Sequence, residues 1–207
     1  MTQHELITAV RVVPAYEVDT LGAPFRVTLL DSVHVNYDPK LDKDFVHIPD
    51  FVGMVNALVR SRAIHPRKLG GSEITFLRKA LGVRAKSLAS YLDISAEHLS
   101  RCETGSKVLS SASERMLRLF VFLATFYESA EDLLAKLDQP EVTAEPTRKA
   151  KVSELGEAFL QYFLTLRIQT VFSADEPLHF ELVRRPAEEG VSPNLDEGDW
   201  SSRRLAA

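Results

Sequence analysis

One stretch of the sequence decides the fold: Val83-Arg-Ala-Lys-Ser-Leu-Ala-Ser-Tyr-Leu-Asp-Ile-Ser-Ala-Glu-His-Leu-Ser-Arg-Cys-Glu-Thr-Gly105. Its pattern is typical of two short helices joined by a tight turn, a helix-turn-helix. Such a pair needs an apolar residue before its first helix, a small residue at the helix crossing, a turn residue that tolerates left-handed backbone, and apolar residues that anchor its second helix. The sequence supplies these, in that order, as Val83, Ala89, Asp93, Ile94 and Leu99.

Further helices are expected on both sides of this pair. Ser72 can cap a helix that runs to Leu81, and Gly82 can end it. A nearly all-apolar helix follows from about Ser111 to Tyr127, and such a helix is buried in a core or in a subunit interface. This succession is what a compact helical DNA-binding domain requires. A helical hairpin that serves only packing is the alternative.

The charge of the chain is unevenly distributed. Its 207 residues carry a net charge of −4, which alone argues against a polyanionic partner. Residues 57–118 nevertheless hold twelve Lys and Arg against five Asp and Glu, a net charge of +7, and the segments on either side are acidic. This asymmetry is expected when one module faces a polyanion such as DNA, although a merely solvated basic face would also produce it.

The first 50 residues have the pattern of a small β-rich domain. Two short alternating runs, Phe25–Leu30 and Val33–Tyr37, are separated by the turn signal Asp31-Ser32. Asp50 can then cap a connecting helix in residues 51–69. Because these first 50 residues contain no cysteine, the domain is expected to fold by apolar packing without zinc.

The chain beyond the apolar helix is less regular. Residues 139–152 contain two prolines among mostly polar neighbours and are predicted to be a linker. Residues 153–185 are expected to form a helix followed by a hairpin of the alternating runs 164–169 and 178–183. A continuous helix over 153–171 is the competing interpretation.

Composition excludes several classes of protein. No apolar run approaches the ~18 residues of a membrane-spanning helix, and the first residues lack the pattern of a signal peptide. A lone Cys102 can form neither an internal disulfide nor a thiolate zinc site. We expect an α+β protein, mainly α, with its helix-turn-helix domain at 70–138 and a flexible acidic tail at 186–207.

The helical region resembles a known family. Gly71-Ser-Glu-Ile-Thr-Phe-Leu-Arg-Lys-Ala-Leu-Gly82 and Ser100-Arg-Cys-Glu-Thr-Gly105 are similar to the Xre/Cro-type helix-turn-helix domain. Together with Ile48-Pro-Asp-Phe51 and the helix after it, they resemble more narrowly the MqsA (YgiT-type) antitoxin family, over roughly residues 25–125. The resemblance implies an N-terminal toxin-binding domain with zinc and a C-terminal DNA-binding dimer that represses its own operon.

The sequence also departs from that family. The N-terminal domain lacks the cysteines of the family's zinc site, Cys102 replaces an aromatic residue, Ala85 replaces a common glutamine, and a long extension follows the fourth helix. A dimeric transcriptional regulator, acting as a repressor or autorepressor at a palindromic operator, therefore fits better than an antitoxin. A type II antitoxin, and an interaction adaptor whose helix-turn-helix has lost DNA binding, are the alternatives.

Roles on DNA follow from positions in the motif. The helix at 96–103 is expected to lie in the major groove, with its first turn and outward face at the base edges. Arg101 can bind guanine O6 and N7, and Glu97 can accept from cytosine N4 or, alternatively, pair with Arg101. The predicted DNA-binding residues are Arg84, Lys86, Ser95, Ala96, Glu97, His98, Ser100, Arg101, Thr104, Ser106 and Lys107. Those placed for phosphates are Arg84, Lys86, Thr104, Ser106 and Lys107.

The fourth helix of this domain is expected to form a dimer interface, because its apolar surface exceeds what one small domain can cover. The predicted interface residues are Met116, Leu119, Phe120, Phe122, Leu123 and Phe126. The expected partners are double-stranded DNA, a second copy of the chain and, through the N- or C-terminal domain, a toxin or another regulator. No membrane partner is expected. The expected location is the bacterial cytoplasm, at the nucleoid when the protein is bound to DNA.

Other candidate sites are weaker. Four residues that could bind a metal lack the spacing of a tetrahedral site, and surface roles are preferred for them. They are His34, Asp44, His47 and Asp50. Cys102 with His98 suggests a nucleophile and a base, but a structural cysteine is preferred. The sequence has no glycine-rich phosphate loop and no G-x-S-x-G or H-E-x-x-H motif, and we expect neither an enzyme nor a bound metal or cofactor.

Overall fold

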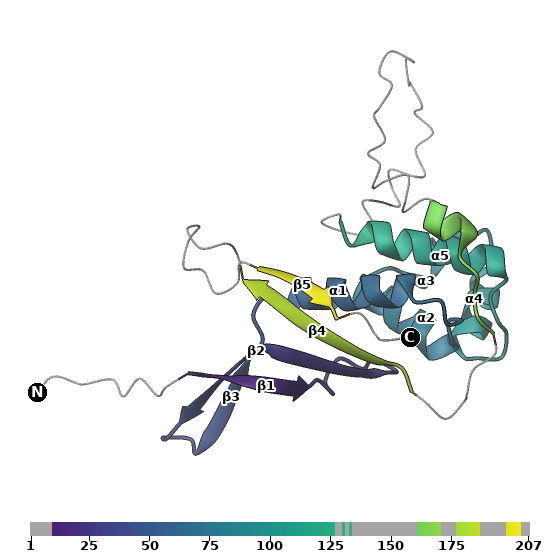
Figure 1. Cartoon of the computed structure of the whole chain (residues 1–207). Coiled ribbons are helices and arrows are strands. Elements are labelled where there is room, and N and C mark those ends of the chain that lie inside the picture. Colours follow the sequence, from purple (N-terminus) through teal and green to yellow (C-terminus); the bar gives the residue numbers. More distant parts are fainter. Residues whose placement is uncertain are drawn as a thin grey trace, which may run out of the picture. The chain divides into compact units, whose positions relative to one another are not determined.

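The computed structural model describes residues 10–126, 130, 133, 161–170, 177–186 and 198–203 (Figure 1). The chain divides into two compact units: Met1–Leu58 with Glu176–Ala207, and Val59–Asp175. The described strands belong to the first unit, and the second contains a series of helices, so the predicted α+β class is confirmed. None of the helices described has both the length and the apolar character of a membrane span.

The described strands of the first unit form one sheet, with the order β1-β2-β4-β5 and with β3 also paired to β2 (Figure 1). β2 is antiparallel to β1 and β3 but parallel to β4, and β5 is antiparallel to β4. β3 and β4 follow one another along the same edge of β2, because β1 occupies the opposite edge. The strands are β1 (Arg11–Glu17), β2 (Arg26–Asp38), β3 (Lys43–His47), β4 (His179–Pro186) and β5 (Gly198–Ser202).

The two alternating runs predicted at 25–30 and 33–37 belong to a single strand, β2. Between them, Asp31 and Ser32 stand opposite the single residue Pro14 of β1, which makes a β-bulge. Asp31 has a φ of 47°, a left-handed conformation that aspartate tolerates better than most residues. Because Pro14 has no N–H to lose, the sheet ladder continues past the bulge. The Asp-Ser signal therefore marks a bulge rather than a turn.

The C-terminal part of the chain completes this sheet, so the predicted hairpin is wrong. β4 pairs in parallel with β2, not with residues 164–169. This pairing buries Phe180 and Leu182, and the Phe180 ring packs edge-on against Phe25 with 5.0 Å between ring centroids. Residues 1–50 are therefore not a separate domain, because strands from residues 179–202 complete their sheet.

β5 lies within the residues predicted to be a flexible tail, and that prediction is also wrong for this segment. Trp200 of β5 is only 4% exposed. Its indole N–H donates to the carbonyl oxygens of Pro49 and Asp50, each at 3.1 Å. A buried aromatic ring with a satisfied polar atom is a strong anchor for a short strand.

α1 (Phe51–Ile64) begins as predicted, because the Asp50 carboxylate accepts from the backbone N–H of Gly53 at 2.9 Å and caps the helix. The boundary between the two units falls inside this helix, between Leu58 and Val59. The prediction that residues 51–69 form a connecting segment of their own is therefore wrong. Residues near the end of α1 are buried in the helical unit.

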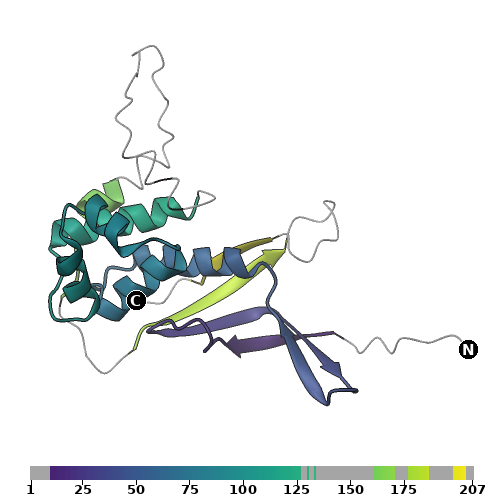
Figure 2. The same ribbon diagram turned by 180° about the vertical axis from the view of Figure 1, so that it is seen from behind.

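The helical unit contains α2 (Gly71–Ala80), α3 (Ala85–Tyr91), α4 (Ala96–Glu103) and α5 (Ser111–Ala124), which begin and end within a few residues of their predicted limits (Figure 2). α4 packs against both α2 and α3. The predicted apolar faces supply the core, in which the largest fully buried aliphatic and aromatic side chains of α2–α5 are Ile74, Leu77, Leu88, Leu99, Leu117 and Phe120.

A later segment, 161–170, returns to the helical unit. It is helical only over 161–165, so neither a continuous helix to 171 nor a strand of the predicted hairpin is formed. Phe163 packs against Phe122 with 5.5 Å between ring centroids, and Gln169 exchanges backbone hydrogen bonds with residues 66 and 68. The predicted linker at 139–152, and residues 153–160 of the predicted extension, lie outside the described residues.

Candidate nucleic-acid interface

α3, the turn after it and α4 have the geometry of a helix-turn-helix. Asp93 adopts a φ of 52°, as its position in the motif predicts. The chain reverses through backbone hydrogen bonds from Asp93 N to Ser90 O and from Ile94 N to Ala89 O, at 3.1 and 3.0 Å. Ser95 then caps α4, and its hydroxyl accepts from the backbone N–H of His98 at 3.0 Å. Local turn chemistry thus fixes where α4 begins.

The far end of α4 is held by an ion pair that the sequence analysis missed. Arg78, near the end of α2, donates from Nε to Glu103 at 2.6 Å and from a terminal nitrogen to Val83 O at 3.0 Å. Both charged side chains are about 15% exposed. One guanidinium therefore ties together α2, the start of the motif and the end of α4. The sequence signal that could have revealed this ion pair was the placement of opposite charges at two helix ends, Arg78 near the end of α2 and Glu103 at the end of α4.

A close backbone contact also positions α4. A Cβ atom built on Gly71 would lie 2.5 Å from the carbonyl oxygens of Cys102 and Glu103, and 2.8 Å from Gly105 N. Only glycine allows the start of α2 to approach the end of α4 this closely. Cys102 is itself fully buried, and burial raises the pKa of its thiol, as expected for a structural cysteine rather than a nucleophile.

The predicted DNA-binding residues share one property: all are exposed except His98, which is half-buried. Leu99 and Cys102 of the same helix face the core. α4 therefore has a packed side and an outward side, and the outward residues are those that the motif assigns to base contacts. The exposed members are Arg84, Lys86, Ser95, Ala96, Glu97, Ser100, Arg101, Thr104, Ser106 and Lys107.

Glu97 and Arg101 form an ion pair on this outward side, one of the two alternatives that the sequence left open. A terminal nitrogen of Arg101 lies 2.5 Å from Glu97 Oε1. The side chains remain 73% exposed for Glu97 and 53% for Arg101. Such an exposed pair contributes little to stability, so its side chains are available to a ligand.

The turn after α4 is ordered by its own contacts. Gly105 has a φ of 77°, which favours glycine, and the backbone N–H of Lys107 donates to Arg101 O at 3.0 Å. The Thr104 hydroxyl donates to Arg101 O at 3.2 Å and lies 3.1 Å from the Ser106 hydroxyl. This turn therefore places the exposed Lys107 side chain beside the end of α4.

The exposed charges around α4 are mostly positive. Over residues 70–110 of the described chain, exposed cations outnumber exposed carboxylates by five to two. The cations are Lys79, Arg84, Lys86, Arg101 and Lys107, and the carboxylates are Asp93 and Glu97. Five cations on one small domain give the field that a polyanion would meet.

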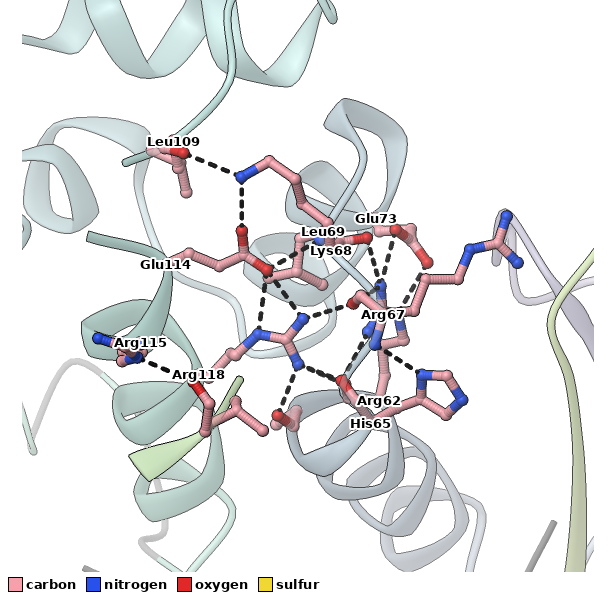
Figure 3. Close-up of polar contacts among 12 residues, drawn as sticks. Arg62, His65, Arg67, Lys68, Leu69, Glu73, Leu109, Glu114, Arg115 and Arg118 are labelled. Carbon is pink, nitrogen blue, oxygen red and sulfur yellow. Dashed lines mark hydrogen bonds and ion pairs between the residues drawn. The ribbon is translucent and has the colours of Figure 1, made fainter. Parts of the chain in front are cut away.

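Not all of the basic residues of this region belong to that surface. Arg62 and Arg118 are fully buried, and Figure 3 shows them at the centre of a polar cluster between the end of α1 and the start of α5. Arg62 binds both oxygens of Glu73 at 2.7 and 2.9 Å. Arg118 binds Glu114 Oε1 at 2.8 Å. Because each of these arginines is paired with a carboxylate of the same region, they add no net charge to the surface.

This cluster fixes the chain between α1 and α2. Arg118 donates to the carbonyl oxygens of Ala63 at 2.9 Å and Arg67 at 2.6 Å, and Arg62 donates to those of Arg67 and Lys68 at 3.0 and 3.1 Å (Figure 3). Glu114 accepts from the backbone N–H of residue 69 at 2.9 Å. Arg118 thus satisfies a carbonyl oxygen that the end of α1 leaves without a helical partner, and both guanidiniums hold the non-helical residues that follow.

His65 lies at the edge of the same cluster, where its Nδ1 accepts from the backbone N–H of Arg67 at 3.2 Å (Figure 3). Burial, followed by the positive charges of Arg62, Arg118 and Arg67, lowers the pKa of His65 to about 4. The side chain is therefore neutral at pH 7. Burial likewise lowers the pKa of Arg118, although the hydrogen bond that Arg118 donates to Glu114 opposes this shift.

The six residues predicted for a dimer interface fall into two sets. Phe120 and Phe122 are buried within the chain, against Tyr91 and Phe163. The others are accessible: Met116 and Leu123 of α5 are 41% and 38% exposed, Leu119 is partly exposed, and Phe126, in the turn after α5, is 65% exposed. A buried face and an accessible face therefore coexist on one helix.

The other candidate ligands do not converge. His34 and His47 face each other across β2 and β3 with 6.2 Å between ring centroids. Asp44 pairs with Arg11, and Asp50 caps α1. Among the described residues, no three His, Cys, Asp or Glu side chains come close enough together to hold a metal ion.

Comparison of the chain with protein-family models, with curated proteins and with solved structures gave no match. The class of this site is therefore defined by its geometry alone: a helix-turn-helix whose second helix has an exposed polar side with cations on either side of the motif.

Proposed function

We propose that this protein is a sequence-specific DNA-binding transcriptional regulator of the Xre/Cro type. One observation carries the proposal: α4 is fixed by its cap, its ion pair and its packing, and the only side it leaves accessible bears polar and charged groups suited to base edges. Any amphipathic surface helix has a polar outward side, so the supporting features are the rigid placement of α4 and the cations that flank it.

The flanking residues support the same function. Arg84 and Lys86 at the start of α3 and Lys107 after α4 are exposed on either side of the motif. Lysine and arginine there can contact phosphates, which set the register of a protein on DNA without specifying sequence. The outward residues of α4, above all Ala96, Ser100 and Arg101, are then left for base contacts.

The test is binding to duplexes enriched by the protein from a pool with a random core, followed by anisotropy titrations of enriched and scrambled duplexes over a salt series. Lys107→Ala should weaken both complexes alike and make the salt slope shallower by about one per subunit. Lys43→Ala, which removes an exposed charge from β3 in the other unit, is the matched control and should change neither. Failure to enrich any sequence, or equal effects of the two variants, would contradict the proposal.

We further propose that two copies bind a palindromic operator as a homodimer through α5. Met116, Leu119, Leu123 and Phe126 are spaced by three, four and three residues, the a/d spacing that lets two helices pack along a seam. The exposure of Met116, Leu123 and Phe126 leaves this seam available to a second copy. Autorepression follows if the operator lies at the protein's own promoter.

Light scattering at micromolar concentration tests the dimer. The parent chain should have twice the mass of one chain, and Leu123→Glu should halve it by placing a charge in the seam. Val108→Glu, at another exposed apolar position outside α5, should leave the dimer intact. A monomeric parent chain, with and without DNA, would refute this assembly.

A protein partner is a second candidate function, in keeping with an antitoxin or an adaptor. It is favoured by two apolar side chains that are about half exposed on the same face of the sheet, Val12 of β1 and Phe45 of β3. Soluble monomers expose large apolar patches mainly at interaction sites. A Val12→Ser/Phe45→Ser variant should then lose a protein that co-purifies with the parent from the native host, yet bind DNA normally.

A further inference from the structure

The two alternatives that the sequence offers for Glu97, pairing with Arg101 or contacting a base, are compatible in the structure. In the described contacts, the pair uses one terminal N–H of Arg101 and one oxygen of Glu97. A guanidinium has five N–H donors and a carboxylate has two oxygens, each with two lone pairs. Enough donors remain for a bidentate contact with guanine, and Glu97 Oε2 remains for a cytosine amino group.

We propose that Glu97 and Arg101 act as a single readout unit that recognises a cytosine and a guanine in each half-site. This inference rests on the proposed DNA-binding function. Within the unit, Glu97 is a specificity-determining residue: it contacts cytosine and also positions Arg101 for guanine.

The spacing of the pair limits where the two bases lie. Residues four apart on a helix are separated by about 6 Å along its axis. Successive base pairs of B-form DNA are separated by about 3.4 Å. The cytosine and the guanine should therefore lie one or two base-pair steps apart.

Electrostatics gives a second argument for the unit. A carboxylate on a DNA-facing side is repelled by phosphates, which weakens binding to every sequence. Arg101 offsets that repulsion at 2.5 Å, and cytosine N4 offsets the remaining cost by donating to Glu97. Guanine and thymine present only acceptors to Glu97, and adenine presents its N6 donor next to the N7 acceptor, so the carboxylate discriminates most strongly against guanine and thymine.

The experiment compares the parent with two variants that each remove one negative charge. Glu97→Gln removes the carboxylate of the unit, and Asp93→Asn removes an exposed carboxylate from the neighbouring turn while keeping a residue that tolerates the left-handed backbone. The probes are the duplex that the parent enriches from the random pool, its single base-pair substitutions, and a scrambled duplex. Thermal melting verifies that both variants fold.

Both variants should bind the scrambled duplex a few-fold more tightly, because each loses one repulsive charge. Only Glu97→Gln should lose discrimination at one C·G pair, by about 5- to 150-fold, the range that corresponds to a good base contact. Discrimination at a guanine one or two steps away should weaken with it, because Arg101 is no longer positioned. Arg101→Ala should abolish discrimination at that same guanine.

Equal strengthening of all duplexes by Glu97→Gln and Asp93→Asn, with base preferences unchanged, would overturn the inference, since Glu97 would then only neutralise charge. A loss of preference at a guanine far from any affected cytosine would overturn it too. If the parent enriches no sequence at all, the proposed function itself fails. The two failures are therefore distinguishable.

Discussion

Two ion pairs of the helical unit have the same sequence spacing and opposite surroundings. Glu114 and Arg118 on α5 are both fully buried, whereas Glu97 and Arg101 on α4 are 73% and 53% exposed. Arg118 also donates to several backbone carbonyl oxygens, and Glu114 also accepts from Lys68 and from a backbone N–H. In the described contacts, the side chains of Glu97 and Arg101 bind only one another.

The difference shows that spacing alone does not set the role of an ion pair. A buried charge must be compensated on every side, so the α5 pair belongs to a network that holds the chain between α1 and α2. An exposed pair is solvated and contributes little to the fold, so the remaining polar atoms of the α4 pair are available to a ligand. One pair stabilises the fold, and the other is suited to recognition.

The largest effect is expected for Arg118→Met. It leaves Glu114 buried with less compensation and removes donors from several carbonyl oxygens, so the free energy of unfolding should fall by about 3–5 kcal/mol. Arg101→Ala is the matched control on α4 and should lower it by less than about 1 kcal/mol. Urea denaturation of both variants measures the difference. If both variants lost the same free energy of unfolding, the proposed difference between the buried and the exposed ion pair would be wrong.

Gly71→Ala tests whether backbone packing fixes the helix that carries the exposed pair. The added Cβ would meet backbone atoms at 2.5 Å, so α4 must shift or α2 must unwind, at a cost of about 1–3 kcal/mol. Gly70→Ala is the control, because its Cβ would meet only the Glu73 carboxylate, at 3.4 Å. Urea denaturation should separate the two variants. A neutral Gly71→Ala would show that the end of α4 is less constrained than its contacts indicate.

The buried network should also make stability depend on pH. The pKa of His65 is about 4 in the folded protein against 6.5 for an unperturbed histidine, so the unfolded state takes up the proton first as pH falls. The contribution of His65 to stability is complete above pH 6.5 and is lost progressively toward pH 4. After allowance for partial exposure, the loss should be of the order of 1 kcal/mol.

Denaturation of the parent, His65→Asn and His47→Asn at several pH values between 7 and 4 measures this dependence. His65→Asn should flatten the profile between pH 6.5 and 4. His47→Asn, at an exposed position on β3, should leave the profile unchanged. If the two variants behaved alike, the lowered pKa of His65 in the folded protein would be disproved.

The smallest effect is expected for the coupling between Glu97 and Arg101 in the free protein. A double-mutant cycle with Glu97→Ala and Arg101→Ala should give about 0.3–0.5 kcal/mol, as for other exposed helical pairs four residues apart. A coupling above about 2 kcal/mol would mean that the pair stabilises α4 and is not readily available to DNA.

The sequence by itself determined the local elements of the helical unit. Helical periodicity, the cap Asp50, Gly82 after α2 and Asp93 at the turn all act within a few residues of the chain. They therefore predicted α1 to α5 and the outward residues of α4, because helix starts, turns and faces depend on neighbouring residues.

Tertiary structure alone decided the partners that are distant in sequence. β2 pairs with β4 about 150 positions later, and an alternating run does not specify which strand it will pair with. The roles of Arg62 and Arg118 were equally hidden, since a sequence records charge but not burial. Whether an arginine contacts solvent, a carbonyl oxygen or DNA depends on how the helices pack around it, and packing is non-local.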